Sequence, residues 1–335
     1  MRAVVVHEFG GLQNAVLDEA PDPVPGPRDV LVEVHATAAN YVDILLIGGK
    51  HQSRPPLPYI PGKGPAGVVR AVGAAVTEFS PSDRVLAMCE PGGGYAELIA
   101  VPETQVYRIP DSMPFADAAS MALIYDTAWF SLCERGRYAA GETVLVLGGT
   151  GGVGLAAIRL VKALGGTALA GVSDPAKADM AREAGADAII ELDRDDLRDS
   201  LRDQVHAVTG GAGADIVIDP LGDRYFEAAI RALAWCGRMV VVGFAAGAIP
   251  TVKTNYLLVR NIDVCGLQIG DYRKRAPERT AACFEQLFAL YEAGKIGPPP
   301  TATMPLDAVR EALGAIRDRR ARGRIVLLQD RPSGG

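Results

Sequence analysis

Two patterns of apolar residues divide the chain. In the N-terminal third, short runs of β-branched or alternating apolar residues are separated by Pro and Gly, and they cover residues 3–6, 30–38, 67–72, 84–88 and 95–101. Short strands joined by turns of this kind are typical of a partly open barrel of antiparallel strands. We therefore expect the chain to begin with a β domain.

From Thr143 onward, apolar strand segments alternate with helical segments. The strand segments are 143–147, 167–172, 188–191, 215–219, 238–243 and 262–266. Six strands joined by crossover helices predict a doubly wound parallel sheet of the Rossmann type. A predicted helix over residues 114–132 leads into this region.

The C-terminal segment predicts two helices, 277–293 and 306–320, and a last strand, 323–328. So short a segment suits completion of the first domain better than a third domain. We therefore expect an α/β protein, in which the β domain contains residues 1–123 and 267–335 and the Rossmann domain contains residues 124–266.

A glycine-rich turn joins the first predicted Rossmann strand to its helix. The turn consists of Gly149, Thr150, Gly151, Gly152, Val153 and Gly154. In this context the first glycine allows the tight turn, the second lets a pyrophosphate approach the backbone, and the third lets helix and strand pack closely. The phosphates would lie at the helix N-terminus. The motif predicts a dinucleotide site, with a turn that binds no ligand as the alternative.

The end of the next predicted strand indicates which dinucleotide binds. An acidic residue there would bind the ribose diol of NAD, but this chain has Ser173. Serine does not repel a 2′-phosphate, and Lys177, one helical turn further on, supplies a positive charge. We expect NADPH rather than NADH. Asp174 argues against this choice, although it is also suited to cap a helix whose first residue is Pro175.

Composition and charge exclude several kinds of partner. The 335 residues carry a formal net charge of −6, which argues against nucleic acid or an anionic membrane as a partner. No apolar run is long enough to span a bilayer and no signal peptide is recognisable, so we expect a cytoplasmic protein. The five cysteines have no CxxC spacing and are interpreted as reduced core residues.

Several short segments together carry a family resemblance. Besides the glycine-rich turn they are residues 40–43, 55–62, 73–85, 93–97, 127–128, 140–146, 184–187 and 323–327. In this order they resemble the zinc-independent medium-chain dehydrogenase/reductase superfamily, and especially its quinone oxidoreductase (zeta-crystallin-like) branch. The resemblance implies a GroES-like catalytic domain made of both chain ends and an active site between it and the Rossmann domain. It also implies homodimers that pair through the last Rossmann strand, here 261–266.

Zinc ligands of the related alcohol dehydrogenases are missing. Those enzymes use a Cys in the first matching segment and a Gly-His-Glu motif in the second, because zinc prefers thiolate and imidazole. This chain has Asn40 and Tyr41 in the first place and Lys63 in the second, and Cys89 stands alone where a structural zinc needs four cysteines. We expect no metal. Hydride transfer then suits an acceptor that is already electron-poor, such as a quinone or an α,β-unsaturated carbonyl.

The resemblance makes four residues candidates for the acceptor side. Asn40 orients nicotinamide or substrate, or it is a turn residue at a strand end. Tyr41 donates a hydrogen bond, or it is a core aromatic. His51 is a proton donor or a solvated loop residue. Lys63 supplies positive charge to an enolate or an acidic substrate group, or it is an exposed loop lysine. Asp43 is suited to cap the helix that follows.

Further cofactor contacts are implied at Thr127, on the nicotinamide side, and at Gly243 and Phe244, which follow a strand at the carboxyl edge of the sheet. Asp219 is either a buried structural residue or a cofactor contact. Basic clusters at 273–275 and 317–324 are either solvated faces or a binding site for an anionic substrate such as a coenzyme A thioester.

The leading prediction is an NADPH-dependent, metal-free reductase of quinones or α,β-unsaturated carbonyls. A reductase of acrylate-type acids or enoyl-CoA esters is one alternative. The other is an NADPH-binding, crystallin-like protein with little turnover.

Overall fold

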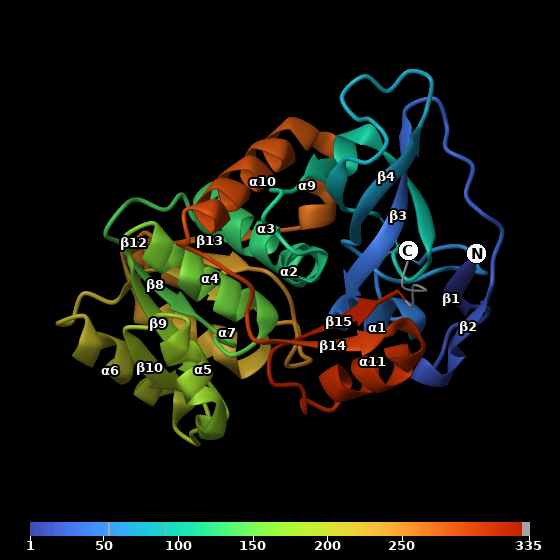
Figure 1. Ribbon diagram of the computed structural model, residues 1–335. Coiled ribbons are helices and arrows are strands. Elements are labelled where there is room, and N and C mark those ends of the chain that lie inside the picture. Colours follow the sequence, from blue (N-terminus) through green and yellow to red (C-terminus); the bar gives the residue numbers. More distant parts are fainter. Residues whose placement is uncertain (53, 91, 330–335) are drawn as a thin grey trace. The chain divides into compact units, whose positions relative to one another are not determined.

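The chain forms two compact units in the computed structural model, which describes residues 1–52, 54–90 and 92–329 (Figure 1). The first unit contains residues 1–123, 272–292 and those from 297 onward, and the second contains residues 124–271 and 293–296. The sequence prediction assigned residues 267–271 to the β domain. They lie in the second unit because the Leu267 amide donates to the Val241 carbonyl and so continues the sheet of that unit.

A seven-stranded sheet forms the centre of the first unit, in the order β14–β15–β3–β4–β5–β7, with β6 paired to β3. Its strands are β3 (Asp29–Ala38), β4 (Ala66–Val72), β5 (Arg84–Ala87), β6 (Leu98–Pro102), β7 (Val106–Arg108), β14 (Thr301–Pro305) and β15 (Arg324–Leu328). A separate two-stranded sheet pairs β1 (Arg2–Val6) with β2 (Ala15–Glu19). The expected β domain of antiparallel strands is confirmed by these pairings, except that β14 and β15 pair parallel.

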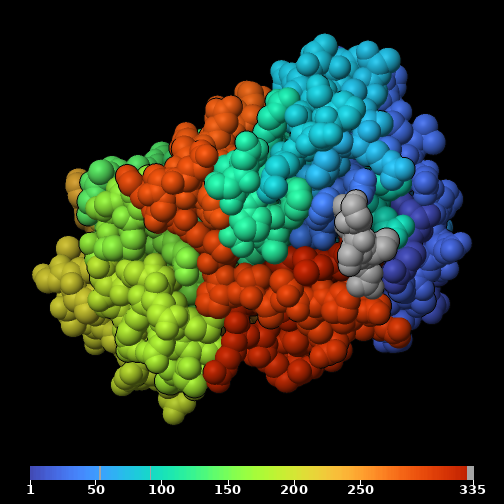
Figure 2. Space-filling model, viewed as in Figure 1, coloured from blue at the N-terminus to red at the C-terminus, as the bar shows by residue number. Residues whose placement is uncertain are grey.

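Both ends of the chain build this unit. Strand β15 pairs antiparallel with β3, with Val326 opposite Ala38, and helix α11 (Val309–Arg317) packs on α1 (Tyr41–Ile47). Figure 1 shows the red C-terminal strand beside the blue one, and Figure 2 shows red and blue atoms adjoining at the surface. The remaining helices that contribute are α2 (Phe115–Met121), α10 (Pro277–Glu292) and the part of α9 (Ile269–Arg275) that begins at Tyr272.

The helix predicted over 114–132 is broken. Helix α2 ends at Met121, α3 covers Ile124–Trp129, and a π-helical segment follows over Phe130–Arg135. Leu123 has a φ of 66°, in the left-handed region that does not continue a helix. The break coincides with the passage from the first unit to the second.

The second unit contains a six-stranded parallel sheet in the order β10–β9–β8–β11–β12–β13. The strands are β8 (Thr143–Val146), β9 (Thr167–Val172), β10 (Ala188–Glu191), β11 (Ala214–Asp219), β12 (Leu233–Val241) and β13 (Asp263–Gly266). The helices are α3, α4 (Gly152–Ala163), α5 (Ala178–Glu183), α6 (Leu197–Val208), α7 (Asp223–Ala229) and α8 (Thr254–Arg260). The predicted doubly wound sheet is confirmed. Strand order reverses between β8 and β11, and ligands bind at such switch points at the carboxyl ends of strands.

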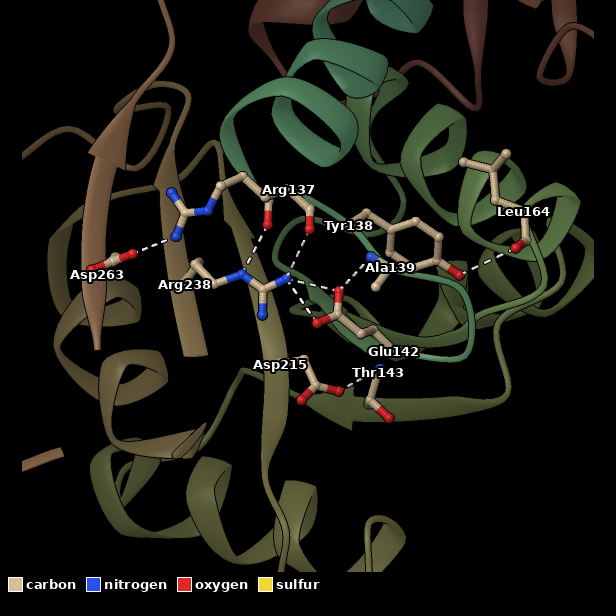
Figure 3. Close-up of polar contacts among 10 residues, drawn as sticks. Arg137, Tyr138, Ala139, Glu142, Thr143, Leu164, Asp215, Arg238 and Asp263 are labelled. Carbon is tan, nitrogen blue, oxygen red and sulfur yellow. Dashed lines mark hydrogen bonds and ion pairs between the residues drawn. The ribbon is translucent and has the colours of Figure 1, made fainter. Parts of the chain in front are cut away.

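Polar contacts occupy the opposite, amino-terminal edge of this sheet (Figure 3). The Arg238 guanidinium donates to both carboxylate oxygens of Glu142, at 2.8 and 2.7 Å, and to the Gly136 carbonyl at 2.8 Å. One Asp215 oxygen accepts the Thr143 amide at 2.8 Å, and Arg137 pairs with Asp263 at the start of β13. These contacts connect loops to the first residues of the strands. A ligand is therefore expected at the opposite, carboxyl edge of the sheet.

In the part of the chain that the structure describes, no helix has both the length and the apolar character needed to cross a membrane.

Candidate active site

The glycine-rich turn lies at the switch point of the second unit. The Leu147 amide donates to Ile218 and the Gly149 amide to Gly171, so the turn is held between β11 and β9. A Cβ atom on Gly154 would lie 2.2 Å from the Gly148 carbonyl oxygen, which only glycine avoids. Helix α4 begins just after Gly151, and the amides of its first turn have no acceptor within the helix. The turn therefore fits the pyrophosphate of a dinucleotide.

Asp219 ends β11 beside this turn and is fully buried. Its Oδ1 accepts the amides of Leu221 and Gly222, each at 2.9 Å, whereas its Oδ2 is buried without a hydrogen-bond partner among the described residues. Burial raises the pKa of this carboxyl, although the two amides act in the opposite direction. Asp219 therefore has a structural role through Oδ1, whereas its Oδ2 has no hydrogen-bond partner among the described residues.

The Gly243–Phe244 turn lies at the same edge. The Val242 amide donates to the Asp219 carbonyl at 2.8 Å and the Gly243 amide does so at 3.4 Å. The Phe244 ring lies over Gly222, where a Cβ atom would come within 2.9 Å of its Cδ1. The predicted contact segments 149–154 and 243–244 thus lie near Asp219, at the carboxyl ends of β8, β11 and β12.

On the other side of the switch point, Ser173 follows β9 and is exposed. Asp174 caps the short 3₁₀ helix Pro175–Lys177, where its Oδ1 accepts the Ala176 amide at 3.1 Å. The expected capping role of Asp174 is confirmed. Lys177 ends that helix.

Thr127 lies on α3 in the second unit and is buried. Its carbonyl accepts the Ser131 hydroxyl at 2.7 Å, and its amide donates to the Asp126 carboxylate at 2.8 Å. These contacts fix the backbone of the residue. Its proposed position against nicotinamide stays a prediction.

In the first unit, Asp43 joins three segments. Its Oδ2 accepts the Asn40 amide at 3.0 Å in a capping box, with Asn40 as the N-cap of α1 and Asp43 at N3, so the expected capping role of Asp43 is confirmed. Asp43 also accepts the Tyr95 hydroxyl at 2.7 Å and the Gly62 amide at 3.3 Å. Burial raises the pKa of Asp43, while Tyr95 and Lys63 act to lower it. The start of α1 and the loop that precedes Lys63 are thereby held together.

Both polar atoms of the Asn40 side chain have partners. Its Nδ2 donates to the Ala38 carbonyl at 2.9 Å, and its Oδ1 accepts Nη2 of Arg324 at 2.8 Å. Arg324 also donates to the Ser120 carbonyl at 3.1 Å, and burial lowers its pKa to about 10. Asn40 is therefore more than a turn residue at a strand end, because the buried Arg324 of β15 fixes its side-chain amide.

The other acceptor-side candidates differ in exposure. Tyr41 is 46% exposed, so the interpretation as a core aromatic is wrong. His51 lies beyond the C-terminal end of α1, where its amide donates to Leu45 at 3.2 Å, and its side chain is half-buried. The contacts of Asp43 bring Asn40 close to the loop of Lys63.

Lys63 is buried, so the interpretation as an exposed loop lysine is wrong. Its Nζ donates to Oε2 of Glu90 at 2.5 Å, and Oε1 of Glu90 accepts Nη1 of Arg273 at 2.6 Å. Burial raises the pKa of Glu90, but Lys63 and Arg273 together outweigh it and leave that pKa lowered. The three side chains form a buried ionic cluster in the first unit.

Comparison with known proteins identifies the family. Residues 26–111 match the alcohol dehydrogenase GroES-like domain family, and residues 152–286 match the zinc-binding dehydrogenase family. The quinone oxidoreductase-like protein 2 homolog of Nematostella vectensis is 36% identical over 327 residues, which cover 97% of this chain and 88% of the relative. The chain belongs to the quinone oxidoreductase family of medium-chain dehydrogenases/reductases.

Other members are similar over their full length. Human quinone oxidoreductase is 31% identical over 330 residues and 98% of each chain. The structure of mycobacterial Rv1454c complexed with NADPH matches with a TM-score of 0.88 and 29% identity, over 98% of this chain and 100% of that one. This quinone oxidoreductase family member therefore combines a GroES-like domain with a Rossmann domain, and it is an oxidoreductase with a nicotinamide cofactor.

Among the described residues, no group of three or more His, Cys, Asp or Glu side chains is arranged to hold a metal ion. At the two positions where the resemblance implied the zinc ligands of alcohol dehydrogenases, this chain has Asn40, whose Oδ1 accepts Arg324, and Lys63, whose Nζ donates to Glu90.

Sequence reasoning missed Glu90, Arg273 and Arg324 as site residues. Arg273 had been interpreted only as part of a basic cluster at 273–275, yet it is 1% exposed, whereas its neighbours Lys274 and Arg275 are exposed. Arg324 stood within a matching segment but gave no sign of its partner. For Arg324 the available signal was a charged residue in an otherwise apolar strand, because such residues are buried only when paired.

Proposed function

We propose that this protein is an NADPH-dependent, metal-free oxidoreductase that reduces quinones or α,β-unsaturated carbonyls. The observation that carries the proposal is the turn at 149–154, where the close approach at Gly154 and the free first-turn amides of α4 suit a pyrophosphate at the switch point. NADPH, when bound, supplies the hydride. The chain's own residues bind the cofactor, orient the acceptor and donate hydrogen bonds to the oxygen that gains charge.

The choice of NADPH over NADH rests on Ser173. It occupies the strand end where a carboxylate would repel a 2′-phosphate, and the neighbouring Asp174 is engaged in capping the next helix. Lys177 ends that short helix and is close enough in sequence to supply positive charge. The NADPH complex of mycobacterial Rv1454c is consistent with this choice.

The metal-free mechanism rests on what replaces the zinc ligands. Asn40 has an amide and Lys63 an ammonium group, and the buried Lys63 is paired with a carboxylate. The positive charge of Lys63 would repel a zinc ion. Neither the Asn40 amide nor the Lys63 ammonium group resembles the thiolate and imidazole that zinc prefers. Asn40 and Lys63, with Tyr41 and His51, are proposed to face the acceptor. Thr127, Lys177, Gly243 and Phe244 are proposed to contact the cofactor.

The structure gives less support to acids or coenzyme A esters as acceptors. That alternative relied partly on the basic cluster at 273–275, but the Arg273 side chain is buried and paired with Glu90. Neutral conjugated carbonyls therefore remain the proposed acceptors.

We further propose a homodimer that forms through the last Rossmann strand. Strand β13 is an edge strand of the sheet, and such edges pair readily with another chain. In the same unit, each of four apolar residues is at least 75% exposed: Trp235, Ile249, Leu258 and Val259. Helix α8 has no buried residue at all, which is unusual for an apolar helix of a monomer.

The function is tested by mixing the purified protein with NADPH or NADH and a panel of quinones, enones, acrylates and enoyl-CoA esters. Loss of absorbance of the reduced nicotinamide measures turnover. We expect turnover with quinones or enones and a preference for NADPH. Tight NADPH binding without turnover on any acceptor would support the crystallin-like alternative, and stoichiometric zinc by elemental analysis would overturn the metal-free mechanism.

A further inference from the structure

The strand order of the parallel sheet gives the direction in which a dinucleotide crosses it. Ser173 follows β9, the glycine-rich turn follows β8, and Asp219 ends β11, and these three strands are neighbours in the order β9–β8–β11. In the proposed complex the 2′-phosphate lies beside Ser173 and the pyrophosphate on the turn. The nicotinamide half then extends toward β11 and β12. The end of β11 is therefore on the nicotinamide side.

Asp219 places a buried carboxyl group at this strand end. The residue is 0% exposed, and its Oδ1 accepts the amides of Leu221 and Gly222, whereas Oδ2 has no hydrogen-bond partner among the described residues. Asparagine would accept the same two amides through its side-chain oxygen, so the turn by itself does not require a carboxylate. A buried carboxylate is normally paired with a cation, because an unpaired buried charge is costly. The ionisable group at this position therefore has no explanation within the turn.

The segments next to Asp219 supply no cation for it. Residues 146–151, at the end of β8, and residues 240–248, at the end of β12, include no titratable side chain. The Arg224 guanidinium on α7 is exposed and lies 5.3 Å from the centre of the Tyr225 ring. Burial raises the pKa of Asp219, the amides of Gly222 and Leu221 lower it, and no charged side chain of the described residues is among the causes. The titratable residues of α7 are Asp223, Arg224, Tyr225 and Glu227.

The turn that follows Asp219 fixes the position of the carboxyl group. Gly222 has a φ of 68° and Asp223 a φ of 53°, both in the left-handed region. A Cβ atom on Gly222 would lie 2.9 Å from Cδ1 of Phe244, and the Asp223 amide donates to the Ala248 carbonyl at 3.0 Å. A charge that is held rigidly and away from water acts on another charge over a longer distance than it would in solvent.

We infer that Asp219 is the counter-charge of the oxidised nicotinamide ring, and that it strengthens the binding of NADP⁺ relative to NADPH. The inference deepens the proposed function and rests on it. The interaction acts through space, so it needs no direct contact between the cofactor and the buried Oδ2.

The charge change in the reaction gives this residue its role. When bound, NADPH supplies a hydride, which carries both electrons of its C–H bond to the acceptor and leaves one positive charge on the nicotinamide ring. The acceptor then takes a proton from water. Because the ring gains its charge as the hydride leaves, a carboxylate at the end of β11 stabilises the transition state and the oxidised cofactor more than it stabilises NADPH.

The test compares the binding of three ligands to the full-length protein by calorimetry. D219N keeps an oxygen for the two amides of the turn and removes the negative charge. We expect the ratio of the Kd for NADP⁺ to the Kd for NADPH to rise about tenfold in D219N, which corresponds to about 1.4 kcal/mol. Adenosine 2′,5′-bisphosphate has no nicotinamide ring, so its Kd should stay unchanged.

D215N is the matched control. Asp215 lies at the other end of β11, where its Oδ2 accepts the Thr143 amide at 2.8 Å. The substitution removes the same charge from the same strand, but at the amino-terminal edge, so the ratio of the two Kd values should not change. A purely structural Asp219 predicts that D219N weakens all three ligands by one common factor. That result, or an unchanged ratio in D219N, overturns the inference.

The wild-type protein tests the same charge without a variant, so the inference remains testable if D219N does not fold. The positive ring favours the ionised carboxyl, so NADP⁺ should bind more tightly as pH rises through the pKa of Asp219, which burial raises. The 2′-phosphate is common to both cofactor forms and cancels in the ratio. Between about pH 5 and about pH 9 the ratio of the Kd for NADP⁺ to the Kd for NADPH should fall. A ratio that is constant over this range, or that rises, overturns the inference.

Failure of the proposed function would look different. If the wild-type protein binds NADPH and NADP⁺ but oxidises NADPH with no acceptor, the reductase is refuted, and the Kd ratio still decides the role of Asp219. If the wild type turns over and D219N keeps the wild-type ratio, only the inference about Asp219 is refuted.

Discussion

The Arg324 guanidinium donates to the side-chain oxygen of Asn40 at 2.8 Å, in a place where both residues are buried. The two residues lie 284 positions apart in sequence, at opposite ends of the chain. This single contact links β15 to the start of α1 and orients an amide that we propose to face the acceptor.

Removal of that contact should destabilise the protein. R324M leaves the Asn40 oxygen and the Ser120 carbonyl without their charged donor. Hydrogen bonds to charged groups contribute about 1.5–3 kcal/mol, so we expect the free energy of unfolding in urea to fall by about 3 kcal/mol. The exposed Arg320 in the same unit is the control, and R320M should leave stability unchanged. Equal stability of the two variants would contradict a structural role for the Asn40 contact.

Gly154 and Gly314 provide a matched pair of glycine-to-alanine changes. A Cβ atom on Gly154 would lie 2.2 Å from the Gly148 oxygen, whereas one on Gly314, inside α11, meets nothing within 4 Å. G154A should abolish NADPH binding, measured by fluorescence titration. G314A should bind normally and gain about 1 kcal/mol of stability, because alanine favours a helix. Normal NADPH binding by G154A would refute the site.

Ser173 is expected to set the choice between the two cofactors. S173D places a carboxylate at the end of β9, where it repels a 2′-phosphate and can bind a ribose diol. We expect the ratio of the Kd for NADH to the Kd for NADPH to fall at least tenfold, which corresponds to about 1.4 kcal/mol. The variant D174N serves as the control, because asparagine also caps helices. An unchanged ratio in S173D would show that Ser173 does not contact the 2′-phosphate.

The Glu90 ion pairs predict a pH dependence of stability. Lys63 and Arg273 lower the pKa of Glu90 below its usual 4.5, so the unfolded chain binds this proton more readily than the folded one. The stabilisation is therefore fully present above pH 4.5 and is lost as pH falls below that value. E90Q should be less stable than wild type at pH 7, and the difference in unfolding free energy should shrink below pH 4.5. A constant difference across that range would contradict the assignment.

The exposed apolar face of α8 predicts the effect of a charge on dimerisation. L258E places a carboxylate on a residue that is 80% exposed and apolar, within the proposed interface. We expect the dimer dissociation constant, measured by sedimentation velocity, to rise at least tenfold, which corresponds to about 1.4 kcal/mol. V208E, at an exposed position at the end of α6, is the control. A monomeric wild-type protein would refute the interface outright.

Local patterns in the sequence predicted part of this fold well. The strands of the parallel sheet have both faces covered, so they form continuous apolar runs, and Leu145 and Val217 are fully buried as those runs required. Strand β14 was missed because most of its residues are exposed, so no apolar alternation marks it. It exists because β15 pairs with it along its whole length.

Some residues of the candidate site were likewise predictable from local sequence, and others were not. Asp174 was expected to cap a helix from its place before Pro175, because capping is decided within a few residues. Lys63 had two interpretations in the sequence, and neither included Glu90, 27 positions away, or Arg273 beyond it. Residues this far apart meet only when the segments that carry them pack together, and local pattern does not determine that packing.

The sequence by itself determined the dinucleotide turn and the Rossmann order of elements, because glycine sterics and apolar periodicity act over short stretches of chain. Tertiary structure alone decided that Lys63 is buried, that it shares the Glu90 carboxylate with Arg273 and that Arg324 fixes Asn40. The physical reason is that burial and pairing of a charge depend on which distant segments fold against it. The surroundings of the residues that we propose to face the acceptor are therefore a property of the folded chain, whereas the glycine-rich turn is encoded locally.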